Sequence, residues 1–486
     1  MQKLETLLND VQVVDTVGNR QVEVTSVGFD SRKVLHGQLF IAISGTQVDG
    51  HKFIPDAIAK GAVAVVCEIL PNSIVEGVTY VIVPNSLVAC GRIASSFFGN
   101  PSQKLKLVGI TGTNGKTTTV TLLYRLFKEL GYKVGLLSTV VNYVNDVEVS
   151  ATHTTPDAIA LNELLANMVD AGCEFCFMEV SSHSIDQHRI EGLSFAGGIF
   201  SNITHDHLDY HKTFDSYIKA KKAFFDALPK TAFALTNVDD KNGMVMVQNC
   251  KGNIQTYGLK NPGSFKSRIV ENHFDGMLLN INGSDVWTRF IGDFNGYNLT
   301  AVYGAAVLLG ASSSEVLRII SALGPVNGRF EYVKSSNGIT AIVDYAHTPD
   351  ALVNVIDTIN KMRNEGQRLL VVVGAGGNRD KSKRPVMASV AASNADFVVL
   401  TSDNPRNEDP NDILNDMKQG ILPEQSGKVL AITDRREGIK TACMLAKPND
   451  IILVAGKGHE TYQEVQGVKH HFDDKEVLRE IFESLK

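Results

Sequence analysis

The sequence lacks the uninterrupted apolar run of about 18 residues or more that a membrane-spanning helix requires. Its first residues also lack the charged segment followed by an apolar stretch that directs secretion. We therefore expect a cytoplasmic protein that does not insert into membranes. With 47 lysines and arginines against 53 aspartates and glutamates, the chain has no cationic surplus to neutralise a nucleic-acid backbone, so nucleic acid is not an expected partner.

Cysteine is also scarce, because six residues in a chain of 486 are too few for a disulfide framework. Cys173 and Cys176 form a C-x-x-C pair within the apolar run CEFCFMEV, which is typical of a buried strand. Side chains three residues apart on a strand point to opposite faces of the sheet. We therefore expect these two cysteines to serve packing rather than metal binding or redox chemistry.

The chain is long enough for about three domains of ordinary size, and its patterns divide it accordingly. Residues 1–102 mix short β-type runs with one predicted helix, FIPDAIAKG, and predict a small α/β domain. In residues 103–327, apolar strands alternate with helices, which predicts a mostly parallel central sheet. Residues 328–486 repeat the alternation and predict a doubly wound, Rossmann-like α/β domain that binds ligands at the carboxyl ends of its strands.

The segment G-I-T-G-T-N-G-K-T-T, residues 109–118, follows a predicted strand and opens an amphipathic helix. Glycines there let backbone N–H groups converge on phosphate oxygens, and the helix start adds partial positive charge. Lys116 supplies a mobile cation, and the Thr117 hydroxyl can hold Mg²⁺. Ile110 replaces one glycine of the general pattern, so the match is to a variant phosphate loop. We predict a P-loop ATPase-type domain, with ATP contacts at Gly112, Thr113, Asn114, Gly115, Lys116, Thr117 and Thr118.

Further polar segments follow the ends of two other predicted strands. Glu179 ends the apolar run FCFME, where a single carboxylate would more simply reach solvent. Residues 201–211, SNITHDHLDYH, gather three histidines and two aspartates, which together with a phosphate loop favours Mg²⁺-assisted phosphoryl transfer. On the next predicted helix, the spacing of Lys219, Lys221 and Lys222 is explained as an ordinary charged face.

The order of these segments resembles the Mur ligase family, and the resemblance extends across the whole chain. It is carried by G-T-N-G-K-T-T, E-V-S-S-H, H-D-H-L-D-Y-H and Y-x-x-A-K. The resemblance implies that Lys221, the lysine of Y-x-x-A-K, is carbamylated and helps to place a metal. The implied metal ligands are Thr117, Glu179, His207 and the carbamylated Lys221. It also places the nucleotide near Asn295, Arg329 and Asp344, and the implied catalytic residues are Lys116, Lys221, Glu179 and His207.

The segments D-S-R, residues 30–32, and G-x-x-x-D-G-H-x-F-I resemble the family members that add diaminopimelate or lysine to a UDP-linked muramyl dipeptide. The implied contacts to UDP-N-acetylmuramoyl-L-alanyl-D-glutamate are Ser31, Thr154, Thr155, Ser181, Gln187 and Arg189. From the residues alone, Thr155 followed by Pro156 and Asp157 is equally a good helix start.

The segment D-N-P-R, residues 403–406, matches the diaminopimelate motif of that branch. The planar guanidinium of Arg406 can bind the distal carboxylate of meso-diaminopimelate with two parallel hydrogen bonds. Lysine has no distal carboxylate, so a lysine-specific enzyme gains nothing from this arginine. The implied diaminopimelate contacts are Arg379, Asp403, Asn404, Pro405, Arg406, Gly456 and Glu460.

The resemblance implies an enzyme in which ATP phosphorylates the γ-carboxylate of the D-glutamyl residue, and the amine of diaminopimelate attacks the acyl phosphate. The expected cofactors are ATP, Mg²⁺ and the carbamylated lysine, and a monomer is expected. The third domain should close over the central one, bring residues 112–118 and 403–406 to one cleft and exclude water. A lysine-adding ligase, a folylpolyglutamate synthetase-like ligase and a non-catalytic nucleotide switch are the alternatives.

Overall fold

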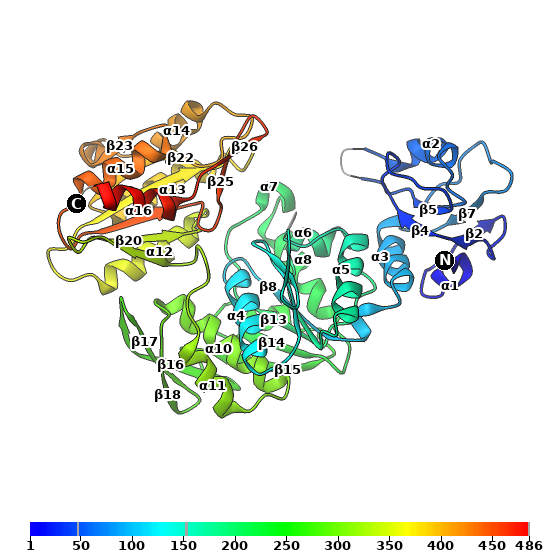
Figure 1. Cartoon of the computed structure of the whole chain (residues 1–486), viewed down its shortest axis with the longest axis horizontal. Coiled ribbons are helices and arrows are strands. Elements are labelled where there is room, and N and C mark those ends of the chain that lie inside the picture. Colours follow the sequence, from blue (N-terminus) through cyan, green and yellow to red (C-terminus); the bar gives the residue numbers. More distant parts are fainter. Residues whose placement is uncertain (46–47, 151–153, 485–486) are drawn as a thin grey trace.

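The computed structural model describes residues 1–45, 48–150 and 154–484 and divides them into three α/β units. The units follow one another along the long axis of the molecule, with the central unit between the other two (Figure 1). Their main sheets have five, eleven and six strands. This architecture confirms the expected α/β class with three units. Within the described residues, no helix combines the length and apolarity needed to cross a bilayer.

The N-terminal unit has a sheet in the order β2-β7-β6-β5-β4, in which only the β2–β7 pair is antiparallel. Its strands are β2 (Asp15–Val17), β4 (Ser26–Gly28), β5 (Gln38–Ile41), β6 (Ala64–Cys67) and β7 (Thr79–Ile82), with the short pair β1 (Gln2–Lys3) and β3 (Glu23–Val24) beside it.

The prediction of a single helix in this unit is wrong. The expected helix is α2 (Ile54–Ala59), but α1 (Leu4–Leu7) and α3 (Ser86–Phe97) are also present. Helix α3 begins at Asn85, whose side chain accepts a hydrogen bond from the Val88 N–H.

The central sheet has the order β11-β10-β9-β12-β8-β13-β14-β15-β16-β17-β18. Parallel pairing connects β9 (Val134–Leu137), β12 (Phe175–Glu179), β8 (Lys106–Thr111), β13 (Gly197–Phe200), β14 (Phe233–Asn237), β15 (Asn253–Gly258) and the start of β16 (Phe265–His273). The two ends of the sheet are antiparallel, formed by β10 (Asn142–Val144) with β11 (Val147–Val149) and by β16 with β17 (Gly276–Ile281) and β18 (Ser284–Thr288). The expected mostly parallel sheet is therefore extended by antiparallel strands at both edges.

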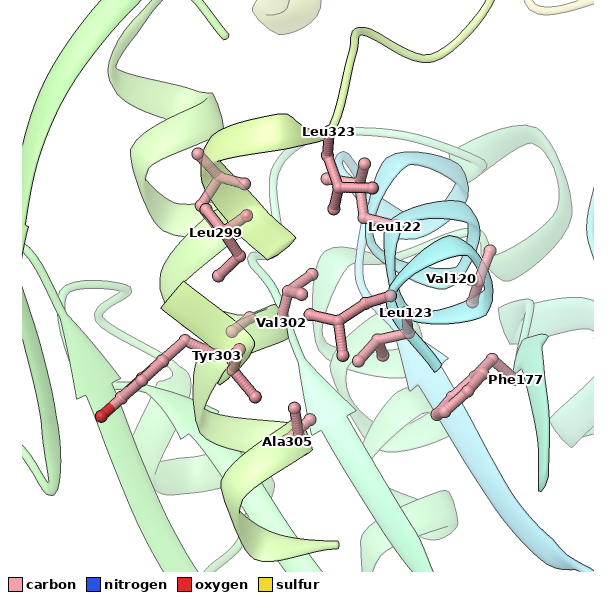
Figure 2. Packing of buried hydrophobic residues seen from close by; sticks show 14 of the residues in the cluster. Val120, Leu122, Leu123, Phe177, Leu299, Val302, Tyr303, Ala305 and Leu323 are labelled. Atoms are coloured by element: carbon pink, nitrogen blue, oxygen red, sulfur yellow. The ribbon is translucent and has the colours of Figure 1, made fainter. Parts of the chain in front are cut away.

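Helices cover both faces of the central sheet, so its parallel strands are buried on both sides. On one face, α4 (Lys116–Glu129) packs against α10 (Asp293–Leu308), where Leu123 points toward Val302 and Leu122 lies beside Leu323 (Figure 2). The other helix near this face is α11 (Ser313–Ala322). The opposite face is covered mainly by α5 (Ala158–Asp170) and α8 (Phe214–Asp226), with the shorter helices α6 (Ser182–Asp186), α7 (Leu208–His211) and α9 (Gly243–Met246). Cys173 and Cys176 are both buried in this second core, as expected for packing residues. The expectation that they point to opposite faces of the sheet is wrong, because Cys173 precedes β12 and lies in the same hydrophobic cluster as Cys176.

The C-terminal unit is doubly wound, as expected. Its sheet has the order β19-β20-β24-β21-β22-β23, formed by β19 (Glu331–Lys334), β20 (Thr340–Asp344), β24 (Ile451–Ala455), β21 (Leu369–Ala375), β22 (Phe397–Ser402) and β23 (Val429–Ala431). One face is covered by α12 (Pro349–Met362), α13 (Lys383–Asn394) and α14 (Pro410–Lys418), and the other by α15 (Arg435–Leu445) and α16 (Asp474–Ser484). A separate hairpin is formed by β25 (Tyr462–Val465) and β26 (Val468–His471).

A fully buried ion pair joins two strand ends of this unit. Arg435 pairs with Asp474 at 2.7 Å, and both side chains are inaccessible to solvent. The same guanidinium donates to the carbonyl oxygens of Ser402 (3.2 Å) and Ala455 (3.1 Å). These carbonyls end β22 and β24, so one side chain fixes the separation of the loops that follow the two strands.

Candidate active site

The central and C-terminal units face each other across a cavity of about 1310 Å³. The central unit contributes residues 112–118, and the C-terminal unit contributes Arg379 and Arg406 from two strand-end loops. The phosphate loop and the D-N-P-R segment therefore border one cavity. Contacts across it also hold the units together: the Asp350 carboxylate accepts hydrogen bonds from Asn114 Nδ2 (2.9 Å) and Thr204 Oγ1 (3.1 Å).

The phosphate loop connects β8 to α4 through two glycines with positive φ, Gly112 (150°) and Gly115 (88°). A Cβ atom on Gly112 would lie 1.9 Å from Ser201 Oγ, so no larger residue fits at this turn. Lys116 Nζ donates to the carbonyl oxygens of Gly112 (3.0 Å) and Thr113 (2.8 Å), and burial lowers the pKa of this amine. The Lys116 ammonium group thus donates to carbonyls of its own loop. Phosphate oxygens of a bound nucleotide would replace these carbonyls as acceptors.

The predicted metal ligands Thr117 and Glu179 are in contact. Thr117 Oγ1 donates to Glu179 Oε1 at 2.8 Å, and Thr139 N–H donates to the same oxygen at 2.8 Å. Glu179 is 1% exposed, and Arg329 Nη2 donates to Thr117 Oγ1 at 3.1 Å. A buried carboxylate held by hydroxyl and amide donors presents an oxygen ligand suited to Mg²⁺ beside the phosphate loop.

Lys221 is buried in the cavity wall, at 1% exposure. Its Nζ donates to the Gly112 carbonyl at 2.8 Å and lies 4.8 Å from the ring centre of Tyr217. Burial, reinforced by the nearby Lys116, lowers its pKa well below the ordinary value. The interpretation of the three helix lysines as a charged face is therefore wrong for Lys221. Spacing along the helix could not show this, because the neighbouring loop is what buries the side chain.

The other two helix lysines form ion pairs along α8, and only Lys219 is exposed. Lys219 is exposed and pairs with Asp215 at 2.7 Å, and Lys222 pairs with Asp226 at 2.6 Å. Each partner lies four residues from its lysine on α8. Only one lysine of the three thus points to the phosphate loop.

His207 borders the same cavity and lies against Asp206, with Nε2 3.4 Å from Oδ2. Burial lowers the pKa of His207 to about 3, against the opposing effect of Asp206, so its imidazole is neutral at neutral pH and able to bind a metal. Among the residues that the structure describes, no three His, Cys, Asp or Glu side chains converge as a metal-binding group. The predicted set has only two such side chains and would depend on the Thr117 hydroxyl and a modified lysine for the others.

Of the three further nucleotide candidates, Arg329 and Asp344 border the cavity, but Asn295 does not. Asn295 is buried behind it and accepts a hydrogen bond from Asn298 Nδ2 at 3.1 Å, and Asn298 reaches the cavity one helical turn later. Burial raises the pKa of Asp344 to about 6, and its carboxylate accepts the Phe330 N–H at 2.7 Å.

Four of the six dipeptide candidates border the cavity, namely Thr154, Thr155, Ser181 and Arg189. Gln187 does not border the cavity, but its Oε1 accepts a hydrogen bond from Arg189 Nε at 3.1 Å. Ser31 belongs to the N-terminal unit and does not line this cavity. The N-cap of α5 is Asp157, whose side chain accepts hydrogen bonds from the Ile159 and Ala160 N–H groups, so Thr155 does not cap this helix. The Thr155 hydroxyl instead donates to the Glu179 carbonyl at 2.9 Å.

The amino-acid candidates converge at the carboxyl ends of β21, β22 and β24. All except Pro405 border the cavity: Arg379, Asp403, Asn404, Arg406, Gly456 and Glu460. Arg406 has a positive φ of 53°, its Nη1 donates to the Gly377 carbonyl at 2.8 Å, and its Nε lies 3.6 Å from Glu464 Oε2.

The hairpin β25–β26, which was not predicted from the sequence, holds the D-N-P-R segment in place. Glu464 O accepts the Arg406 N–H at 3.0 Å, Glu464 N–H donates to Asn404 Oδ1 at 2.9 Å, and Gln463 Nε2 donates to Asp403 O at 2.7 Å. The letters YQEVQGVKHH, with a Q-G turn at their centre, carry a hairpin signal that could have found it. Lys383, also missed, pairs with Asp206 across the two units.

The sequence and the structure of the chain both resemble those of known proteins. Mur ligase models match three parts of the chain: the family's catalytic domain at residues 23–98, the middle domain at 110–306 and the glutamate ligase domain at 328–458. The chain is 58% identical over 480 residues to a Bacteroides fragilis protein named UDP-N-acetylmuramoyl-L-alanyl-D-glutamate--2,6-diaminopimelate ligase, with 99% of each covered.

A Bacteroides thetaiotaomicron protein of the same name is also 58% identical, over 479 residues and 99% of each chain. A solved structure of a protein with this name superposes with a TM-score of 0.71 at 32% identity, covering 100% of this chain and 99% of the other. The similarity thus spans all three units in both sequence and structure, and the chain belongs to the Mur ligase family.

Proposed function

We propose that this chain uses ATP to join meso-diaminopimelate to UDP-N-acetylmuramoyl-L-alanyl-D-glutamate through an amide bond. The observation that carries the proposal is the shared cavity, which has the phosphate loop on one side and Arg379, Arg406 and Glu460 on the other. Full-length relatives that are 58% identical bear the name of this activity. A monomeric state and a cytoplasmic location belong to the same proposal.

The proposed reaction has two steps. An oxygen of the γ-carboxylate of the D-glutamyl residue attacks the terminal phosphorus of ATP, and the bond to the leaving ADP breaks. The amine of diaminopimelate then attacks the acyl carbon, phosphate leaves, and the nitrogen loses a proton to give the amide. In this proposal Lys116 and the loop N–H groups stabilise the negative charge on the phosphate oxygens, and closure of the two units would keep water from the acyl phosphate.

Thr117, Glu179 and His207 are the residues proposed to hold Mg²⁺, which would neutralise phosphate charge when bound. They fit such an ion because a buried carboxylate, a hydroxyl and a neutral imidazole border one cavity. Carbamylated Lys221 would add an anionic oxygen beside them.

Carbamylation of Lys221 is supported by its burial beside the phosphate loop. In this reaction the uncharged amine attacks the carbon of CO₂, a C–N bond forms, and a proton leaves to solvent. We expect that protein held in ¹³C-labelled bicarbonate shows a carbamate carbon resonance by NMR. The resonance should vanish in Lys221→Met and persist in Lys219→Met, the exposed neighbour on the same helix. An equal signal in both variants would place the modification elsewhere.

The amino-acid specificity gives the assay that tests the proposal. With ATP, Mg²⁺ and the UDP-linked dipeptide, we expect ADP release with diaminopimelate to exceed that with L-lysine by about 100-fold in kcat/KM, because a buried polar site rejects a ligand that leaves it unpaired. Folate in place of the dipeptide should support no release. Preference for L-lysine, activity with folate, or nucleotide hydrolysis that needs neither cosubstrate would each refute the assignment.

A further inference from the structure

A buried lysine that the proposed reaction does not use lies beneath the amino-acid loops. Lys457 follows β24 in the segment G-K-G-H-E and is 0% exposed. Both flanking glycines have positive φ, 113° at Gly456 and 54° at Gly458. A Cβ on Gly458 would lie 2.7 Å from the Gly328 carbonyl oxygen and from Tyr345 Cβ. The glycine pair thus lets the backbone turn tightly enough to direct the lysine into the interior.

The Lys457 ammonium group is bound by three acceptors, so its burial is compensated. Nζ donates to Asn404 Oδ1 at 3.2 Å, to Glu460 Oε2 at 3.1 Å and to the carbonyl of Tyr462. The first two belong to residues proposed to contact diaminopimelate, and the third is the first residue of the hairpin β25–β26. One cation therefore connects the D-N-P-R loop, the G-K-G-H-E loop and the hairpin.

The hydrogen bonds that the Glu460 side chain accepts all end on one of its two oxygens, Oε2. Asn404 Nδ2 also donates to Oε2, at 2.7 Å, whereas Oε1 has no hydrogen-bond partner among the described residues. Glu460 borders the cavity. The carboxylate is thus held in one orientation and has one oxygen available for a donor, while the adjacent Lys457 balances its negative charge.

We propose that Lys457 is a specificity-determining positioning residue: by fixing Asn404 and Glu460 and balancing the Glu460 charge, it makes the site prefer an amino acid with a zwitterionic distal end over one with a cationic distal end. This inference rests on the proposed function. A zwitterionic end satisfies Arg406 and Glu460 together. A bare ammonium group brings no second anion to the Arg406 guanidinium, whose Nε lies 3.6 Å from Glu464 Oε2, and it meets a carboxylate whose charge is already balanced.

The test compares kcat/KM for meso-diaminopimelate and L-lysine in the full-length wild type, Lys457→Met, Glu460→Gln and the double variant. In Lys457→Met we expect the preference for diaminopimelate to fall by about tenfold or more, mainly through KM, because a charge-assisted hydrogen bond is lost and Glu460 gains an unbalanced charge. The KM for ATP should stay within about twofold, because Lys457 does not border the phosphate loop. An equal loss with both amino acids, or an equal change in the KM for ATP, would overturn the inference.

The double variant keeps the test decisive if Lys457→Met does not fold, since it leaves no buried charge unpaired. Its preference should differ from that of Glu460→Gln alone by less than the preference of Lys457→Met differs from that of the wild type, because only the Lys457 contact to Asn404 Oδ1 remains to be lost. A further fall of about tenfold in the double variant would overturn the inference. A wild type that turns over no diaminopimelate would reject the proposed function itself, whereas a wild-type preference that survives Lys457→Met would reject only the role of Lys457.

Discussion

Replacing Lys116 with methionine is expected to lower kcat by about 1000-fold, the usual loss when one preorganised electrostatic contact to a reacting group is removed. Lys116 Nζ lies over the Gly112 and Thr113 carbonyls at the start of α4, where it can move onto a phosphate oxygen. Methionine has a similar length and fills the same buried space without the charge. Steady-state ADP release at saturating cosubstrates measures the effect.

The matched control is Lys128→Met on the same helix. Lys128 pairs with Asp146 and does not line the cavity, so its loss should leave kcat within about twofold. Thermal unfolding of both variants separates lost catalysis from lost folding. If Lys116→Met keeps more than about a tenth of the wild-type kcat while folded, the phosphate loop does not perform the proposed role.

Replacing Arg406 with alanine is expected to raise the KM for diaminopimelate by about 100-fold, because the ligand's distal carboxylate loses a paired guanidinium inside a cavity. The KM for ATP should stay nearly constant, since Arg406 and the phosphate loop lie on opposite units. Activity with L-lysine should fall far less, because lysine has no group that pairs with Arg406. Initial rates at varied amino-acid concentration give the KM values.

Arg436→Ala is the control for this change. Arg436 is half exposed, pairs with Glu480 at 2.6 Å and lies outside the cavity, so its removal should leave the KM for diaminopimelate unchanged. A variant of Arg406 with an unaltered KM for diaminopimelate, or with an equally raised KM for ATP, would remove the basis for the assigned amino-acid specificity.

The residues that could be predicted from the sequence are those whose role is set by neighbours in the chain. The phosphate loop is determined by residues adjacent in the sequence, because Gly112 and Gly115 adopt the positive φ of its turns and Lys116 begins the helix that follows. Likewise, the strands of the C-terminal unit are buried on both faces and give continuous apolar runs.

The residues that could not be predicted from spacing depend on contacts between distant segments. Lys221 lies on the same helix as Lys219, and contacts with the distant loop, such as the Gly112 carbonyl 109 positions away, separate their roles. Asn295 lies one turn from the residue that reaches the cavity, a difference set by how α10 docks. The family resemblance proposes roles for both residues, but neither position follows from local pattern.

The Arg435–Asp474 pair constrains how the amino-acid pocket could be redesigned. Two of the three loops that carry the proposed contacts, those after β22 and β24, start from carbonyls held by one guanidinium, which keeps the starts of these two loops at a fixed separation. Exchanging side chains on these loops would alter the lining of the pocket but not the separation of the two backbones. Moving the two loops apart to admit a bulkier amine would therefore require replacing the buried Arg435–Asp474 pair itself.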